Sequence, residues 1–167
     1  MKGRIKHPEW ADKGRIKVEW AERHMPAIGE IVKKYLKTKP LEGIRIGACL
    51  HVTKETAVLV KALQQLGARV RLAGSNPLTT QDDVAAYLDS IGIEVFAWRG
   101  ETQDEYSEMI RQVTEIKPDI VVDDGADLHV TLHEEKKEIA EKVLGGTEET
   151  TTGVIRLKAL SKAGKLL

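Results

Sequence analysis

The chain has 167 residues, with 26 basic and 26 acidic side chains and a formal net charge of zero, which argues against a nucleic-acid or polyanion partner. This length predicts one domain with a substantial core, and the single cysteine, Cys49, excludes a disulfide framework and a thiol metal site. Because no apolar run approaches the roughly 18 residues of a membrane span and the N-terminus is charged, we expect no membrane partner, no signal peptide and a cytoplasmic location.

Residues 1–40 predict an N-terminal helical segment that packs on the rest of the domain. Apolar side chains recur at helical spacing from Ile16 to Leu36, and Pro26 divides this pattern into two helices. The pentapeptide Lys-Gly-Arg-Ile-Lys occurs at residues 2–6 and again at 13–17. A repeat this short does not indicate a solenoid, so the sequence leaves it as either a coincidence or an artificial scar.

The stretch from Gly43 to Leu66 predicts a strand that leads into a helix. Its apolar start ends in a polar turn, after which apolar residues recur at helical spacing. His51, Thr53 and Glu55 therefore fall at the carboxyl end of the strand. In open α/β sheets this edge binds ligands, because helix N-termini and loop side chains converge there.

Strands and helices alternate through the rest of the chain. Further strands are predicted at 69–73, 93–98, 119–123 and 144–147, and further helices at 79–90, 101–116, 134–144 and 151–163. This alternation predicts an α/β domain over residues 41–167, with a five-stranded parallel sheet in a three-layer α/β/α arrangement. We predict a flavodoxin-like or Rossmann-like fold with the strand order 2-1-3-4-5.

Polar residues follow every predicted strand, in segments 50–53, 73–77, 98–101, 123–127 and 147–153. At one edge of a sheet they would form a cleft for a polar, hydroxylated ligand. The sequence contains neither G-x-G-x-x-G nor G-x-x-x-x-G-K-[ST], so it holds no ordinary dinucleotide or nucleoside triphosphate loop. A histidine at the first strand end and a tryptophan at the third exclude a response-regulator receiver. Thr53, Thr56 and Trp98 keep FMN binding as a weak rival.

Five segments resemble, in order and spacing, the substrate-binding region of S-adenosylhomocysteine hydrolase. They are residues 50–59, 75–83, 97–102, 123–128 and 148–153. The resemblance covers residues 15–167, and the form of segment 75–83 is closer to thermophilic bacterial and archaeal members than to animal ones. The chain is thus similar to the N-terminal, substrate-binding domain of this family.

The resemblance implies an NAD-dependent reaction that reversibly hydrolyses S-adenosylhomocysteine to adenosine and homocysteine. In the family the ribose 3′-hydroxyl is oxidised, which acidifies the C4′ proton; homocysteine leaves C5′, water adds and the ketone is reduced. His51 matches the acid or base that serves the C5′ leaving group and the water. Asp124 matches a candidate C4′ base near the ribose, and Glu149 matches a glutamate that hydrogen-bonds the ribose hydroxyls.

The resemblance also implies binding roles for other polar residues. Thr53 and Glu55 match residues that contact the adenine, beside Asp124 and Glu149 at the ribose. The residues that match the run reaching the nicotinamide cofactor are Thr150, Thr151 and Thr152.

Structural roles compete with several of these assignments. Thr53 occupies a position where a helix N-cap belongs, and capping alone would explain it. The acids Asp123, Asp124 and Asp127 also fit a turn and a helix cap, although their crowding predicts at least one raised pKa.

Other conspicuous side chains are assigned to packing or to solvent. His129 and His133 have the i, i+4 spacing of a metal pair, but we find no third ligand and expect a solvated helix face and no metal. We expect Trp98 to pack in the interior.

The sequence also departs from the family pattern. That pattern continues beyond residue 167 into a lysine, an aspartate and an NAD-binding domain, so we expect a separated substrate-binding domain that is inactive alone and binds no NAD. Ala126 replaces a glycine, which puts in doubt a backbone conformation that glycine adopts easily. A surface left bare by absent segments would favour homodimerisation. The alternative is a free-standing or engineered flavodoxin-like module without catalysis, with or without a nucleotide or FMN.

Overall fold

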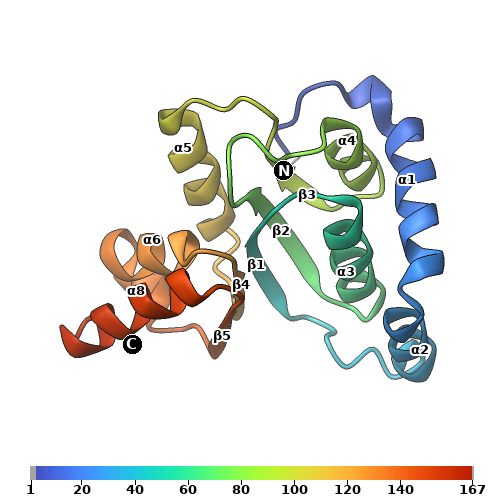
Figure 1. Ribbon diagram of the computed structural model, residues 1–167. Helices are drawn as coiled ribbons and strands as arrows, with labels where there is room; N and C mark the ends of the chain where they lie inside the picture. Colours follow the sequence, from blue (N-terminus) through green and yellow to red (C-terminus); the bar gives the residue numbers. More distant parts are fainter. Residues whose placement is uncertain (1–2, 167) are drawn as a thin grey trace.

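The computed structural model describes residues 3–166 and confirms the α/β fold (Figure 1). The elements are η1 (Pro8–Trp10), α1 (Ala11–His24), α2 (Pro26–Tyr35), β1 (Arg45–Leu50), α3 (Lys54–Gln65), β2 (Arg69–Gly74), α4 (Asp82–Ser90), β3 (Glu94–Phe96), α5 (Gln103–Thr114), β4 (Ile120–Asp123), α6 (Asp127–Glu135), α7 (Lys137–Ala140), β5 (Gly145–Glu148) and α8 (Thr151–Lys162).

The five strands form one parallel sheet in the order β3-β2-β1-β4-β5, so the predicted order 2-1-3-4-5 is wrong. β3 lies beside β2, where its Glu94 ion-pairs with two arginines of that strand. Arg69 pairs with Glu94 at 2.6 Å, and the buried guanidinium of Arg71 pairs with the other carboxylate oxygen. The predicted order would separate Arg71 from this carboxylate, and an unpaired buried charge is strongly destabilising.

Helices cover both faces of the sheet, as predicted (Figure 1). α3 and α4 pack on one face and α5 and α6 on the other, and each face has its own cluster of buried apolar side chains. The N-terminal helices lie outside the first of these layers, where α1 contacts α3 and α4, and α2 contacts α3. The division into an N-terminal helical segment over residues 1–40 and an α/β domain over residues 41–167 stays a prediction.

One predicted helix is wrong. Instead of a helix over 134–144, the structure has α6 and α7, which are separated at Lys136, a residue with the non-helical φ of −132°. α6 begins at Asp127 because Ala126 is left-handed, with φ 65°, and turns the chain sharply after β4. Leu128 and Leu132 then pack into the core beneath α6. The acidic residues before α6 also fit a turn, so the predicted helix begins too late in the chain.

Both copies of the repeated pentapeptide place a glycine against another backbone. In the first copy, Arg4 donates its N–H to the Val95 carbonyl at 2.8 Å and forms a bridge at the edge of β3, where a Cβ on Gly3 would clash. In the second, Gly14 of α1 lies so close to α4 that a Cβ would overlap the Asp83 carbonyl. Each copy therefore serves a separate close contact.

We expect Gly14→Ala to lower the free energy of unfolding by about 1–3 kcal/mol, because the new methyl group overlaps the α4 backbone. Gly29→Ala in α2 is the matched control, since among residues 3–166 no atom lies within 4 Å of a Cβ built there. This control should gain about 0.5–1 kcal/mol from helix propensity. Urea unfolding measures both changes, and equal effects at the two glycines would contradict the overlap.

Candidate functional site

A cavity of about 710 Å³ opens at the carboxyl ends of the strands. Its lining comes from α2, from the ends of β1 and β4, from α3 and from the loops after β2 and β5. The lining residues are Met25, Ile28, Leu50, His51, Thr53, Glu55, Thr56, Leu59, Thr79, Val122, Asp124 and Glu149. Five of the residues singled out from the sequence, His51, Thr53, Glu55, Asp124 and Glu149, thus share one cavity.

Strand register explains why residues so far apart in sequence meet here. Cys49 of β1 pairs with Asp123 of β4, and Asp123 pairs with Glu148 of β5. His51, Asp124 and Glu149 each follow one of these paired residues by one or two positions. Parallel strands end at a common edge, so the three side chains emerge at the same place.

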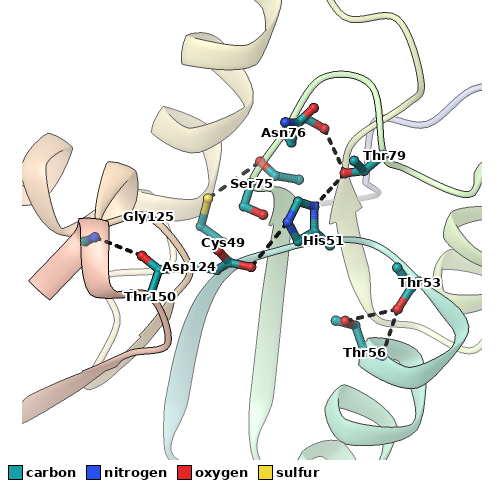
Figure 2. A network of polar contacts seen from close by, with 12 residues as sticks. Cys49, His51, Thr53, Thr56, Ser75, Asn76, Thr79, Asp124, Gly125 and Thr150 are labelled. Atoms are coloured by element: carbon teal, nitrogen blue, oxygen red, sulfur yellow. Dashed lines mark hydrogen bonds and ion pairs between the residues drawn. The ribbon is translucent and has the colours of Figure 1, made fainter.

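His51 contacts two polar side chains (Figure 2). Its Nδ1 lies 2.7 Å from the Thr79 hydroxyl, and its Nε2 lies 3.5 Å from Oδ2 of Asp124. The sequence predicted a helix over 79–90, whereas α4 begins three residues after Thr79, at Asp82. Thr79 is therefore a site residue that the sequence missed, because the helix pattern extended too far toward the N-terminus.

Asp123, the last residue of β4, precedes the cavity residue Asp124 and is almost completely buried. Burial raises its pKa to about 7, with a smaller contribution from Glu148 and Asp127, although backbone N–H groups of His129 and Asp124 oppose the shift. Those N–H groups donate to the two carboxylate oxygens at 2.8 and 3.0 Å. The prediction of a raised pKa among these acids is confirmed, with burial and not crowding as the main cause.

Glu148 joins the two loops that carry Asp124 and Glu149. Its carboxylate accepts the N–H groups of Gly125 and Ala126 at 2.8 and 2.9 Å, and both the N–H and the hydroxyl of Thr150 at 2.8 Å. Positive φ angles at Gly125 and Ala126 aim these two N–H groups at one carboxylate, as in an anion-binding nest. The left-handed backbone of Ala126, which the sequence put in doubt, is thus accommodated.

These hydrogen bonds also control the charge of Glu148. Burial alone would raise its pKa, but the hydrogen bonds from Gly125, Thr150 and Ala126 outweigh it and hold the pKa below its ordinary value. The sequence predicted no role for Glu148, which lies in the segment after the last strand. A carboxylate committed to four donors is a structural bridge between loops.

Thr53 and Glu55 occupy the start of α3. The Thr53 hydroxyl accepts the Thr56 N–H at 3.4 Å, so Thr53 both caps the helix and lines the cavity. Glu55 is exposed at the cavity, and an ion pair with Lys54 at 2.7 Å lowers its pKa. An ionised Glu55 offers two hydrogen-bond acceptors to an N–H or O–H group of a ligand.

The threonine run begins α8 and lies outside the residues that line the cavity. The Thr150 hydroxyl accepts the Gly153 N–H at 2.8 Å as the N-cap, besides donating to Glu148. Thr151 and Thr152 are exposed in the first helical turn. The structure thus brings Thr150 into the loop network and leaves the other two hydroxyls facing solvent.

The cavity lining also includes apolar side chains, which are Met25 and Ile28 at α2 together with Leu50, Leu59 and Val122. Polar side chains complete the lining, including a histidine and three carboxylates. A site of this kind suits a ligand with one flat apolar part and one hydroxylated part.

Trp98 is buried in the core, as predicted, so the aromatic residue that supported FMN binding is not available for stacking at the edge. The expected solvated face at His129 is wrong: α6 packs it inward, and burial lowers its pKa.

Among residues 3–166 no group of three or more His, Cys, Asp or Glu side chains could hold a metal ion. In the same part of the chain no helix is long and apolar enough to cross a bilayer.

Comparison with known proteins places these features in a family. The family model for S-adenosyl-L-homocysteine hydrolase matches residues 3–144. The chain is 60% identical over 157 residues to an adenosylhomocysteinase of Aeropyrum pernix, covering 94% of this chain and 38% of that protein. It is 57% identical over 162 residues to the Sulfolobus acidocaldarius adenosylhomocysteinase, covering 97% of this chain and 39% of that protein. It is 48% identical over 162 residues to an S-inosyl-L-homocysteine hydrolase of Methanococcus maripaludis, with the same coverage of 97% and 39%. The chain therefore spans about two fifths of the length of these relatives.

Proposed function

Because the chain belongs to the S-adenosyl-L-homocysteine hydrolase family, we propose that it forms the nucleoside-binding site of such an enzyme. The ligand would be adenosine or its homocysteine thioether. Relatives named adenosylhomocysteinase and S-inosyl-L-homocysteine hydrolase support a purine nucleoside thioether as the ligand class.

One observation carries this proposal. His51, Asp124 and Glu149 line one cavity of about 710 Å³ whose lining also includes five apolar side chains. A purine ring would pack on the apolar side chains, and the ribose hydroxyls would face the polar ones. Glu55 would accept a hydrogen bond from the purine, beside Thr53 at the helix start.

The proposed roles follow from the chemistry of each side chain. Asp124 would accept a proton or a hydrogen bond near the ribose, and Glu149 would accept hydrogen bonds from its hydroxyls. A histidine ring can both donate and accept a proton, which would suit His51 to serve the departure of a thiolate and the entry of water at C5′. The 3.5 Å separation of His51 from Asp124 would let both groups face one ribose.

The family resemblance implies NAD as cofactor, but the residues present do not form a site for it. The Thr150 hydroxyl is occupied by Glu148 and Gly153, and Thr151 and Thr152 offer only two exposed hydroxyls. The sequence contains no glycine-rich dinucleotide loop. We therefore assign no step of the reaction to NAD on this chain.

Calorimetric titration with adenosine tests the binding proposal. We expect saturable heat, and Asp124→Asn should weaken binding about tenfold or more, because a neutral amide replaces the charged acceptor. Asp104→Asn is the matched control, since Asp104 is an exposed aspartate in the first turn of α5, outside the cavity lining.

Absence of heat at millimolar adenosine, or equal weakening by both substitutions, would refute nucleoside binding at this cavity. Release of homocysteine from S-adenosylhomocysteine with added NAD tests catalysis separately, and we expect none from this chain alone. The expected self-association and cytoplasmic location stay predictions, and light scattering measures the first.

A further inference from the structure

The contact between His51 and Thr79 carries an inference about where the imidazole holds its proton. Nδ1 of His51 lies 2.7 Å from Oγ1 of Thr79, and the same oxygen lies 3.2 Å from the backbone carbonyl of Asn76 (Figure 2). A carbonyl oxygen only accepts hydrogen bonds, so the contact between Thr79 and Asn76, whose carbonyl also accepts the Thr79 N–H at 3.3 Å, requires the hydroxyl to donate its one proton. In that arrangement the hydroxyl oxygen is an acceptor for the ring, and Nδ1 is the donor.

The loop that carries Thr79 is pinned at several points. Leu78 donates its N–H to the Asn76 side chain at 2.9 Å, and Gly100 donates to the Pro77 carbonyl at 2.7 Å. Gln81 donates its N–H at 2.9 Å to the backbone carbonyl of Val52, the residue after His51. The hydroxyl is therefore held in place relative to the ring.

We propose that Thr79 is a positioning residue that fixes neutral His51 as the Nδ1–H tautomer. Nε2 is then the nitrogen that gains and loses a proton, and it is the one that faces Asp124. The two other titratable side chains that line the cavity are Glu55 and Glu149. Because a hydroxyl is uncharged, Thr79 sets the position of the proton without adding charge to this acidic site.

The consequence for the reaction rests on the proposed function. A thiolate leaving from C5′ would be protonated from Nε2 of the cationic ring, and an entering water would give its proton to the same atom. In both steps Nε2 would lose or gain the proton, while Nδ1–H would keep its hydrogen bond to Thr79. The tautomer itself does not depend on any ligand.

Nitrogen NMR of the whole chain, labelled with ¹⁵N and without ligand, tests the tautomer at a pH where His51 is neutral. Long-range proton–nitrogen correlations distinguish a protonated from an unprotonated ring nitrogen. We expect Nδ1–H to predominate in the parent protein. Thr79→Val, which removes the hydroxyl, should shift the ratio of the two tautomers toward Nε2–H by about fivefold or more, as expected for one hydrogen bond.

Thr79→Ser keeps the hydroxyl and should restore the parent ratio. Backbone amide spectra of both variants establish that the fold is retained. Predominant Nε2–H in the parent protein, or an unchanged ratio in Thr79→Val, would overturn the proposal. Because these spectra need no nucleoside, they can support the tautomer even if adenosine fails to bind. Conversely, adenosine can bind even if the spectra overturn the tautomer.

Discussion

Glu148→Ala should lower the free energy of unfolding by about 2–4 kcal/mol, because a carboxylate that accepts four hydrogen bonds holds two loops together. The backbone N–H groups of Gly125 and Ala126 would lose their acceptor. The strain of the left-handed Ala126 would then persist without its hydrogen bond to Glu148. Urea unfolding at neutral pH measures the loss.

Glu149→Ala is the control beside it. Within residues 3–166 no hydrogen bond or ion pair involves the Glu149 side chain, which is exposed at the cavity, so its removal should change stability by less than about 0.5 kcal/mol. Hydrogen exchange adds a local readout, since Gly125 and Thr150 amides should exchange faster only in Glu148→Ala. Equal destabilisation by the two substitutions would show that Glu148 does not join the loops.

The stabilisation that Glu148 provides should be lost at low pH. The pKa of Glu148 is lower in the folded protein than its ordinary value, so its stabilising contribution is present above that ordinary value and is lost as the pH falls through the folded value. The difference between the parent protein and Glu148→Ala should therefore shrink under acid conditions.

The sequence was sufficient to predict that three of its polar residues meet at the cavity. Each strand could be recognised from its apolar run, and parallel strands end at one edge, so His51, Asp124 and Glu149 had to emerge together. Their common cavity did not require the strand order to be correct, because the carboxyl ends of all five strands lie at the same edge.

The strand order and the acceptors within the site could not be predicted in this way. Which strand β3 joins depends on the pairing of Arg71 with Glu94, and periodicity says nothing about partners in space. Glu148 and Glu149 are adjacent and chemically identical in sequence. Only the β4–β5 register directs the first toward the loop amides and leaves the second at the cavity.

Glu101 should make the protein less stable as the pH rises from about 5 to 8. It is 7% exposed, with Oε1 accepting the Trp98 N–H at 3.0 Å, and among the described residues Oε2 has no hydrogen-bond partner. Burial raises its pKa to about 7, and the Trp98 N–H only partly offsets the shift. The folded state therefore holds this proton more tightly than the unfolded chain, and the associated stability is lost as the pH passes through the folded pKa.

Glu101→Gln separates this effect from other titrations, because the amide keeps an acceptor for Trp98 and carries no charge to bury. Between pH 5 and pH 8 the parent protein should lose about 2 kcal/mol of unfolding free energy relative to this variant. Asp123, whose pKa is also raised to about 7, remains in both proteins and cancels in the comparison. Glu141→Gln, at an exposed position after α7, should retain the parent slope. Urea unfolding at the two pH values measures this difference. If the unfolding free energy changed equally with pH in the parent and in Glu101→Gln, Glu101 would be ionised in the folded protein at little cost.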